Sequence, residues 1–138
     1  MTEVFADTFY FLALINPADQ YHSEAIRYTE TLRIPLVTTT AVLIELADAL
    51  SRPIARQVVH RFLANLDADS NIRVVETDPS WYARGLSLFG KRADKSWTLT
   101  DCISFEVMSE RGILEALTGD HHFEQAGFRA LFQPSVKW

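Results

Sequence analysis

Cysteine is almost absent from this sequence, because Cys102 is the only one among 138 residues. A single cysteine excludes an intramolecular disulfide and a cysteine-based zinc site, and it is typical of a protein kept in a reducing compartment. Glycine and proline are scarce too, with five of each, while 48% of the residues are hydrophobic and 22% are charged. This composition excludes a disordered chain and, with the length, predicts one compact domain over residues 1–138.

Basic residues are absent from the first 26 positions, and no uncharged stretch is long. The first cation is Arg27, so the apolar segment near the N-terminus lacks the basic start of a signal peptide. The longest uncharged stretches, 8–18 and 34–44, are about 11 residues each, roughly half of what a membrane-spanning helix needs. We therefore expect a soluble, cytoplasmic protein.

Positive charge is in the minority. The formal net charge is -5 and the isoelectric point is near 5.3, the reverse of the basic excess that marks many nucleic-acid-binding proteins. A nucleic-acid function must therefore rest on a local site. The first glycine is Gly85, which excludes the glycine-rich turn of a dinucleotide-binding fold.

Short apolar runs alternate with longer helical patterns, and several helices are preceded by capping signals at Ser51, Asp78 and Thr98. Strands separated by helices predict an α/β three-layer sandwich: a central, mainly parallel sheet of four or five strands flanked by helices. The carboxyl ends of such strands are where ligands bind. The expected strands are 3–6, 35–38, 72–76, 114–118 and an edge strand near 130–132, and the expected helices are 18–32, 40–50, 52–66, 79–92 and 98–112.

Four carboxylates attract attention because no Lys or Arg lies within two positions of any of them: Asp7, Glu45, Asp101 and Asp120. Asp7 and Asp120 follow predicted strands directly, so both are expected at the carboxyl edge of the sheet. Glu45 and Asp101 are expected in the first turns of helices that begin at that edge.

Each acid also has an ordinary explanation. Asp7 fits a helix cap and Asp120 a backbone turn. Asp101 has nearly capping-box spacing from Thr98, and Glu45 fits a solvated face shared with Asp48 and Arg52. Asp101 fits its ordinary role least well. Glu106 and Glu110, on the same predicted helix, lie about 140° and 180° from it, so Asp101 is off the solvated side.

Convergence of these acids would need compensation. Each pair about 4 Å apart would repel by about 4 kcal/mol at an effective dielectric of about 20, which is large beside the stability of a domain, about 5–15 kcal/mol. Protons or cations must offset such repulsion. An all-oxygen cluster without cysteine or paired histidine favours Mg²⁺ or Mn²⁺ over zinc, and such ions at acidic clusters serve mainly phosphate chemistry.

Four segments, spread in order along nearly the whole chain, resemble the PIN-domain nucleases, in particular the VapC-like toxins of bacterial toxin-antitoxin pairs. "VFADTFYFLALINPADQYHSEA" resembles the opening strand and helix with its Asp-Thr pair, and "TTTAVLIELADAL" the helical glutamate. "DKSWTLTDCISFEVM" is the most specific segment, and "LTGDHHF" resembles the closing T-x-D-x-x-F motif. The departures are Thr98 where Ser is commoner and Gly119 where a bulkier residue often lies.

The resemblance implies a Mg²⁺- or Mn²⁺-dependent endoribonuclease with Asp7, Asp101 and Asp120 as metal ligands. Glu45 would position or deprotonate the attacking water, with Thr8 and Thr118 orienting carboxylates. It also implies an RNA substrate, a cognate antitoxin protein and a homodimer. The candidate contacts to the RNA backbone, although most charges on helices are ordinary solvated faces, are Arg52, Arg56, Arg61, Arg84, Lys91, Arg92 and Lys95.

Other interpretations remain open at this stage: a catalytically inactive interaction module with this fold, or a structure-specific nuclease acting on DNA. A receiver domain and a haloacid-dehalogenase-like phosphatase are disfavoured, because Asp7 is followed by Thr8 and Phe9 rather than by a second acid. We expect none of the four histidines to be a metal ligand. Cys102, Trp81 and Trp97 are expected to serve packing rather than chemistry.

Overall fold

The protein is described here by a computed structural model covering residues 2–132. Five strands form one sheet in the order β3-β2-β1-β4-β5, and every pairing is parallel. The strands are β1 (Val4–Ala6), β2 (Leu36–Thr39), β3 (Ile72–Val75), β4 (Glu115–Leu117) and β5 (Arg129–Ala130).

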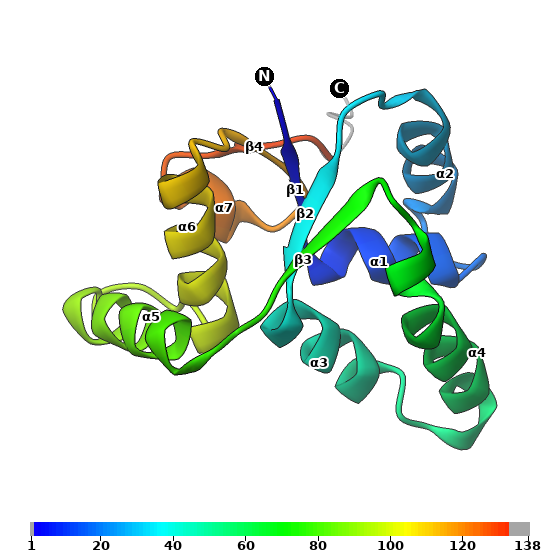
Figure 1. Cartoon of the computed structure of the whole chain (residues 1–138), viewed down its shortest axis with the longest axis horizontal. Helices are drawn as coiled ribbons and strands as arrows, with labels where there is room; N and C mark the ends of the chain where they lie inside the picture. The colour runs from blue at the N-terminus through cyan, green and yellow to red at the C-terminus, as the bar shows by residue number, and fades with distance from the viewer. Residues whose placement is uncertain (1, 133–138) are drawn as a thin grey trace, which may run out of the picture.

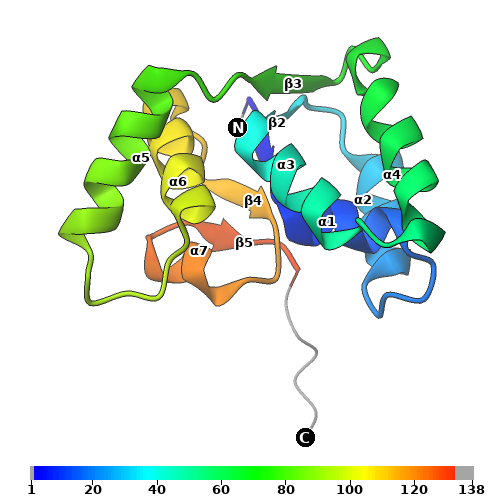
Figure 2. The ribbon, with the colours of Figure 1, turned by 90° about the horizontal axis from the view of Figure 1, so that it is seen from below.

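Helices cover both faces of the sheet, which confirms the predicted sandwich (Figures 1 and 2). One layer contains α1, α2 and α4; the other contains α5, α6 and α7; and α3 continues from the end of β2. The bounds are α1 (Thr8–Ile15), α2 (His22–Thr31), α3 (Thr40–Ala49), α4 (Pro53–Ala64), the short 3-10 helix η1 (Leu66–Ala68), α5 (Pro79–Lys91), α6 (Leu99–Arg111) and α7 (His121–Gln125).

Strand β1 is the centre of the molecule. It lies between β2 and β4 in the sheet, and its residues Val4, Phe5 and Ala6 are 0% exposed. Central strands of parallel sheets are covered on both faces, which is why this run is apolar without alternation. The residue that follows such a strand enters the carboxyl edge from the most buried position available, and here that residue is Asp7.

Local capping chemistry sets where several helices begin. Asp78 accepts a hydrogen bond from the Trp81 backbone N–H at 2.9 Å, as predicted. The prediction that Ser51 starts α4 was wrong: the N-cap is Arg52, and Pro53 takes the first helical position, where its fixed φ and missing N–H are tolerated. At the other end of α6, Gly112 has φ of 68°, the left-handed conformation that glycine adopts most easily.

Within residues 2–132, no helix combines the length and the apolar character that crossing a membrane would require.

Candidate active site

Three of the four acids, Asp7, Asp101 and Asp120, lie at the N-terminal ends of helices, and two of these helices follow strands β1 and β4 at the carboxyl edge of the sheet. Asp7 connects β1 to α1 and is 5% exposed. Asp101 is the third residue of α6 and is 6% exposed, and Asp120 is the N-cap of α7 after β4. Glu45 is the sixth residue of α3 and so lies in its second turn, whereas the sequence predicted the first turn.

Two threonines bind three of these acids. The Thr8 hydroxyl donates to Glu45 Oε1 at 2.5 Å. The Thr118 hydroxyl donates to Asp7 Oδ2 at 2.8 Å and accepts a hydrogen bond from the backbone N–H of Asp120 at 3.0 Å. Thr118 is 0% exposed, so these bonds are shielded from water and fix Asp7 relative to Asp120.

Asp101 is held by Thr98 through two hydrogen bonds. Its Oδ2 accepts from the Thr98 backbone N–H at 3.0 Å while the Thr98 hydroxyl accepts from the Asp101 N–H at 3.0 Å, a complete capping box. The ordinary explanation of Asp101 is therefore also present in the structure. It engages one carboxylate oxygen, and no group of residues 2–132 donates a hydrogen bond to Oδ1. That atom is free to bind a ligand.

His122 was missed by the sequence reasoning. Its Nδ1 lies 3.0 Å from Asp101 Oδ2 and 3.4 Å from Asp120 Oδ1, and its backbone N–H donates to Asp120 Oδ1 at 2.9 Å. The sequence does place it two residues after a predicted edge acid, which is a usable signal. The pair His121-His122 was set aside because adjacent helical residues point to different sides, and His121 is indeed exposed while His122 faces the acids.

Asp7 has an unusual electrostatic environment. Burial, with smaller contributions from the charges of Asp101 and Glu45, raises the pKa of Asp7 to about 7, although hydrogen bonds from the Thr118 hydroxyl and the Thr8 backbone lower it. Among residues 2–132, no Lys or Arg forms an ion pair with any of the four acids. Within these residues, the charges of Asp101 and Glu45 therefore act on Asp7 while no Lys or Arg is paired with it.

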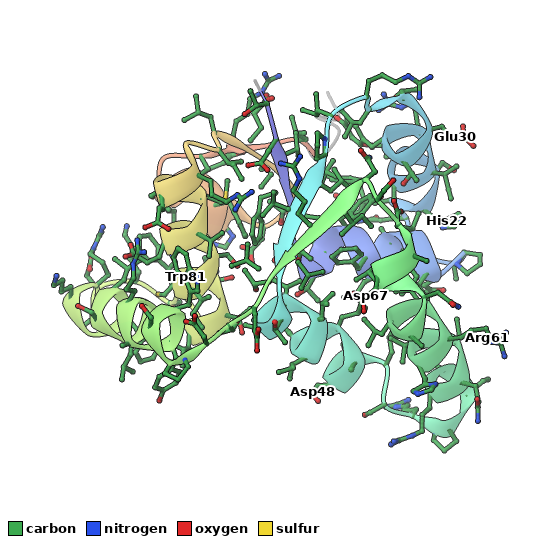
Figure 3. All side chains as sticks on the ribbon, in the orientation of Figure 1. His22, Glu30, Asp48, Arg61, Asp67 and Trp81 are labelled. Carbon is green, nitrogen blue, oxygen red and sulfur yellow. The ribbon has the colours of Figure 1, made fainter. Side chains whose placement is uncertain are left out.

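Other residues singled out from the sequence lie elsewhere or serve packing. His22, the first residue of α2, donates from Nδ1 to the Ala13 carbonyl at 2.8 Å. Asp48 extends from α3 into solvent (Figure 3). Trp97 is 6% exposed, and its Nε1–H donates to Gln125 Oε1 at 3.0 Å. Burial raises the pKa of the Cys102 thiol to about 11, which keeps it protonated and unreactive.

The basic residues that were expected to meet RNA differ in availability. Arg84 pairs with Glu106 and Glu110 and stacks on Trp81, with 4.2 Å from its guanidinium to the ring centre. Arg92 pairs with Asp94. The arginines of α4 and the residue before it, Arg52, Arg56 and Arg61, are exposed, and Figure 3 shows Arg61 pointing away from the sheet.

A cavity of about 710 Å³ lies away from the four acids, between α1, α2, α4 and the edge of the sheet. Most of its lining is apolar, and it shares α1 with the acidic site: Tyr10 and Leu14 line the cavity, whereas Thr8 at the start of the same helix binds Glu45. Its other residues are Tyr28, Thr29, Leu32, Leu36, Val58, Arg61, Phe62, Asn65, Leu66, Asp69, Asn71 and Ile72.

Comparison with known proteins gives a consistent family. A scan against protein families matches residues 4–129 to the PIN domain. VapC20 of Mycobacterium tuberculosis, described as a sarcin-ricin loop cleaving toxin, is similar with a TM-score of 0.82 and 25% identity, over 91% of this chain and 95% of its own. No match was found among curated proteins.

Two further structures share the fold at lower identity. The DNA-bound VapBC structure from Salmonella typhimurium has a TM-score of 0.66 and 15% identity, covering 94% of this chain and 97% of its own. FitAcB from Neisseria gonorrhoeae has a TM-score of 0.66 and 16% identity, covering 92% of this chain and 94% of its own.

Proposed function

The chain belongs to the PIN domain family, and from this premise we propose that it is a Mg²⁺- or Mn²⁺-dependent endoribonuclease, the toxin of a toxin-antitoxin pair that acts in the cytoplasm. The observation that carries the proposal is the state of Asp7. This carboxylate is buried without a Lys or Arg partner in residues 2–132, the charges of Asp101 and Glu45 act on it, and its pKa is raised to about 7. Such an arrangement costs stability unless a cation binds there.

The residues present suit a hard divalent cation. Asp7, Asp101 and Asp120 offer carboxylate oxygens, the donors that Mg²⁺ and Mn²⁺ prefer. Asp101 Oδ1 has no hydrogen-bond donor among residues 2–132. We propose these three acids as the metal ligands, which agrees with the resemblance of the sequence motifs to the PIN-domain nucleases.

The chain's own side chains then have distinct tasks. When bound, the metal supplies Lewis acidity and lowers the pKa of a water molecule. Glu45, held at one oxygen by Thr8 at 2.5 Å, keeps its other oxygen for orienting the attacking water or taking its proton. Thr118 keeps Asp7 turned toward the site. The proposed reaction is hydrolysis of an RNA phosphodiester bond.

RNA must approach a protein of net charge -5, and the site itself accounts for most of that charge. Without its four acids the formal charge would be -1, so a bound dication neutralises much of the local field. The exposed Arg52, Arg56 and Arg61 provide cations for the RNA backbone. Similarity to VapC20, described as a loop-cleaving toxin, supports this substrate class.

We propose a cognate antitoxin as the protein partner, in line with the VapBC structure that shares the fold. We propose that an apolar segment of the antitoxin binds in the apolar cavity beside α1, because α1 lines that cavity and begins directly after Asp7. A homodimer is proposed as well. Tyr82, Leu86 and Phe89 form an exposed stripe on α5, being 50%, 44% and 46% exposed and spaced to share one face.

Cleavage of RNA by purified protein tests the activity. Wild type is expected to cut total cellular RNA with Mg²⁺ or Mn²⁺ and to stop on chelation, whereas Asp7→Asn and Asp101→Asn are expected to lose at least about 10²–10³-fold in rate, because each removes a ligand charge. Asp48→Asn, on the outer face of α3 (Figure 3), is the matched control and is expected to cleave normally.

Three results would contradict the proposal. Equal behaviour of wild type and both aspartate variants would leave an inactive interaction module. Cleavage of flapped or nicked DNA, with RNA untouched, would keep the chemistry and change the substrate. Cleavage that persists under chelation would exclude the metal site.

A further inference from the structure

We propose that His122 is a positioning residue that fixes Asp101 for metal binding. The inference rests on the proposed function, since it concerns the same acidic site. It assigns a role to a histidine to which neither the motif nor the sequence pattern gave one. The side chain of His122 is 17% exposed, compared with 74% for the adjacent His121.

The hydrogen bonds define which nitrogen does what. Nδ1 faces Asp101 Oδ2 at 3.0 Å and Asp120 Oδ1 at 3.4 Å. Carboxylate oxygens accept, so Nδ1 is the donor, and the closer acceptor is Asp101. Together with the Thr98 backbone N–H, this fills the acceptor capacity of Oδ2 in the carboxylate plane and leaves Oδ1 for the metal.

The short helix α7 fixes His122 and Asp120 relative to each other. Asp120 caps α7 by accepting from the His122 N–H at 2.9 Å, so the imidazole and the Asp120 carboxylate have a defined relative position. Phe123, the next residue, is 0% exposed and packs against Phe5 and Phe105, with ring centres 6.3 and 5.0 Å apart. α7 is therefore anchored in the core, and His122 joins the β4 side of the site to α6.

Amide side chains allow the role of each nitrogen to be separated. The amide nitrogen of Asn lies where Nδ1 lies, one bond from Cγ, whereas that of Gln lies nearer to the position of Nε2. A donor needed at Nδ1 is therefore restored by His122→Asn and not by His122→Gln. His121→Asn is the matched control, because His121 is adjacent, exposed and on the same helix.

The experiment measures Mn²⁺ binding by electron paramagnetic resonance and by calorimetry, without RNA. We expect His122→Gln to bind Mn²⁺ about 10–100-fold more weakly than wild type, the range found when an outer hydrogen bond to a metal ligand is lost. His122→Asn is expected to bind within about threefold of wild type, and His121→Asn to bind as wild type, since neither loses a donor to Asp101.

Each other outcome is decisive. Equal affinity of wild type and His122→Gln, or equal weakness of the Asn and Gln variants, overturns the assignment. Directly coordinated imidazole nitrogen in the electron spin echo of bound Mn²⁺ would make His122 a ligand instead, and failure of these variants to fold would make it structural. If wild type itself binds no Mn²⁺, the proposed function fails at the metal step and not merely this role of His122.

Discussion

Strand β1 has a buried carboxylate at each end, and the two have opposite environments. Glu3, 7% exposed, precedes the strand, and Asp7, 5% exposed, follows it. Glu3 binds two arginines: Arg111 through both carboxylate oxygens at 3.0 and 2.7 Å, and Arg73 at 2.6 Å. Asp7 has only hydroxyl and backbone donors, with two other acids nearby.

The difference in partners reverses the electrostatics. The hydrogen bond from Arg111, aided by Arg73, lowers the pKa of Glu3, although burial alone would raise it. Burial raises the pKa of Asp7 to about 7, and no Lys or Arg of residues 2–132 is among the groups that lower it. Burial of a carboxylate is thus no sign of function by itself. The paired acid stabilises the fold, and the unpaired acid is the one that a ligand has to complete.

The largest effect expected from this contrast is that ionisation of Asp7 makes the stability of the folded protein depend on pH. The pKa of Asp7 is about 7 when folded, against an ordinary value of 3.8, so between those values the folded protein keeps a proton that the unfolded chain releases. Stability of the metal-free protein therefore falls as pH rises from about 4 to about 7, by up to about 4 kcal/mol. Asp7→Asn, which cannot ionise, is expected to remove this slope.

Thermal denaturation in chelator measures the effect. The Asn variant is expected to be more stable than wild type at pH 8 and similar to it at pH 5. Addition of Mg²⁺ at pH 8 is expected to raise the melting temperature of wild type and not that of the variant, since binding to the folded state stabilises it. If the melting temperatures of the two proteins change with pH in parallel, Asp7 ionises with an ordinary pKa, and the contrast with Glu3 is wrong.

The sequence was sufficient for the strands, for the helices α2 to α6 and for one edge of the sheet, whereas α1 and α7 were not among the predicted helix ranges. Uninterrupted apolar runs predicted the strands, and the parallel topology placed Asp7 and Asp120 at the carboxyl edge, where the structure has them. Local chemistry also predicted the caps at Asp78 and Thr98. These successes share a cause: each depends on residues within a few positions of one another.

Contacts between distant residues could not be predicted in this way. Glu3 and Arg111 are 108 positions apart, and Thr8 and Glu45 are 37 apart, so no local pattern pairs them. His122 contacts Asp101 across 21 positions because of how α7 meets α6. Neither Asp7 nor Glu3 has a Lys or Arg nearby in sequence, yet only Asp7 lacks an arginine partner in the described structure. Glu3 is paired with two arginines that come from β3 and α6.

The second effect tests the paired end of β1. Glu3→Gln removes the charge that Arg73 and Arg111 share, and breaking a buried pair is costly. Because the two arginine side chains are 55% and 34% exposed, water screens part of that loss, and we expect a destabilisation of about 2 kcal/mol rather than the full value. RNA cleavage and Mn²⁺ affinity are expected to remain unchanged.

Denaturant unfolding at pH 7 measures the destabilisation of Glu3→Gln, and unfolding at acid pH tests the direction in which it changes. The pKa of Glu3 is lowered in the folded state, so its contribution is present above the unfolded value of about 4.5 and is lost as pH falls further. Wild type and Glu3→Gln should therefore converge in strong acid. Glu115→Gln, whose partner Arg129 is 74% exposed, is the control and is expected to cost under about 0.5 kcal/mol. Loss of cleavage in Glu3→Gln would contradict the division between the two ends.

The smallest effect concerns Thr118, which replaces a cation as the partner of Asp7. Thr118→Val keeps the shape and removes the hydrogen bonds to Asp7 and from Asp120, for an expected loss of about 1–2 kcal/mol at pH 8. Since this bond lowers the pKa of Asp7, it favours the ionised form, and the loss should shrink toward pH 5. Thr38→Val is the matched control: Thr38 is equally buried and donates to the Ala6 carbonyl at 2.9 Å. Its cost should be the same at both pH values, so equal pH dependence in the two variants would show that Thr118 supports the backbone and not the charge of Asp7.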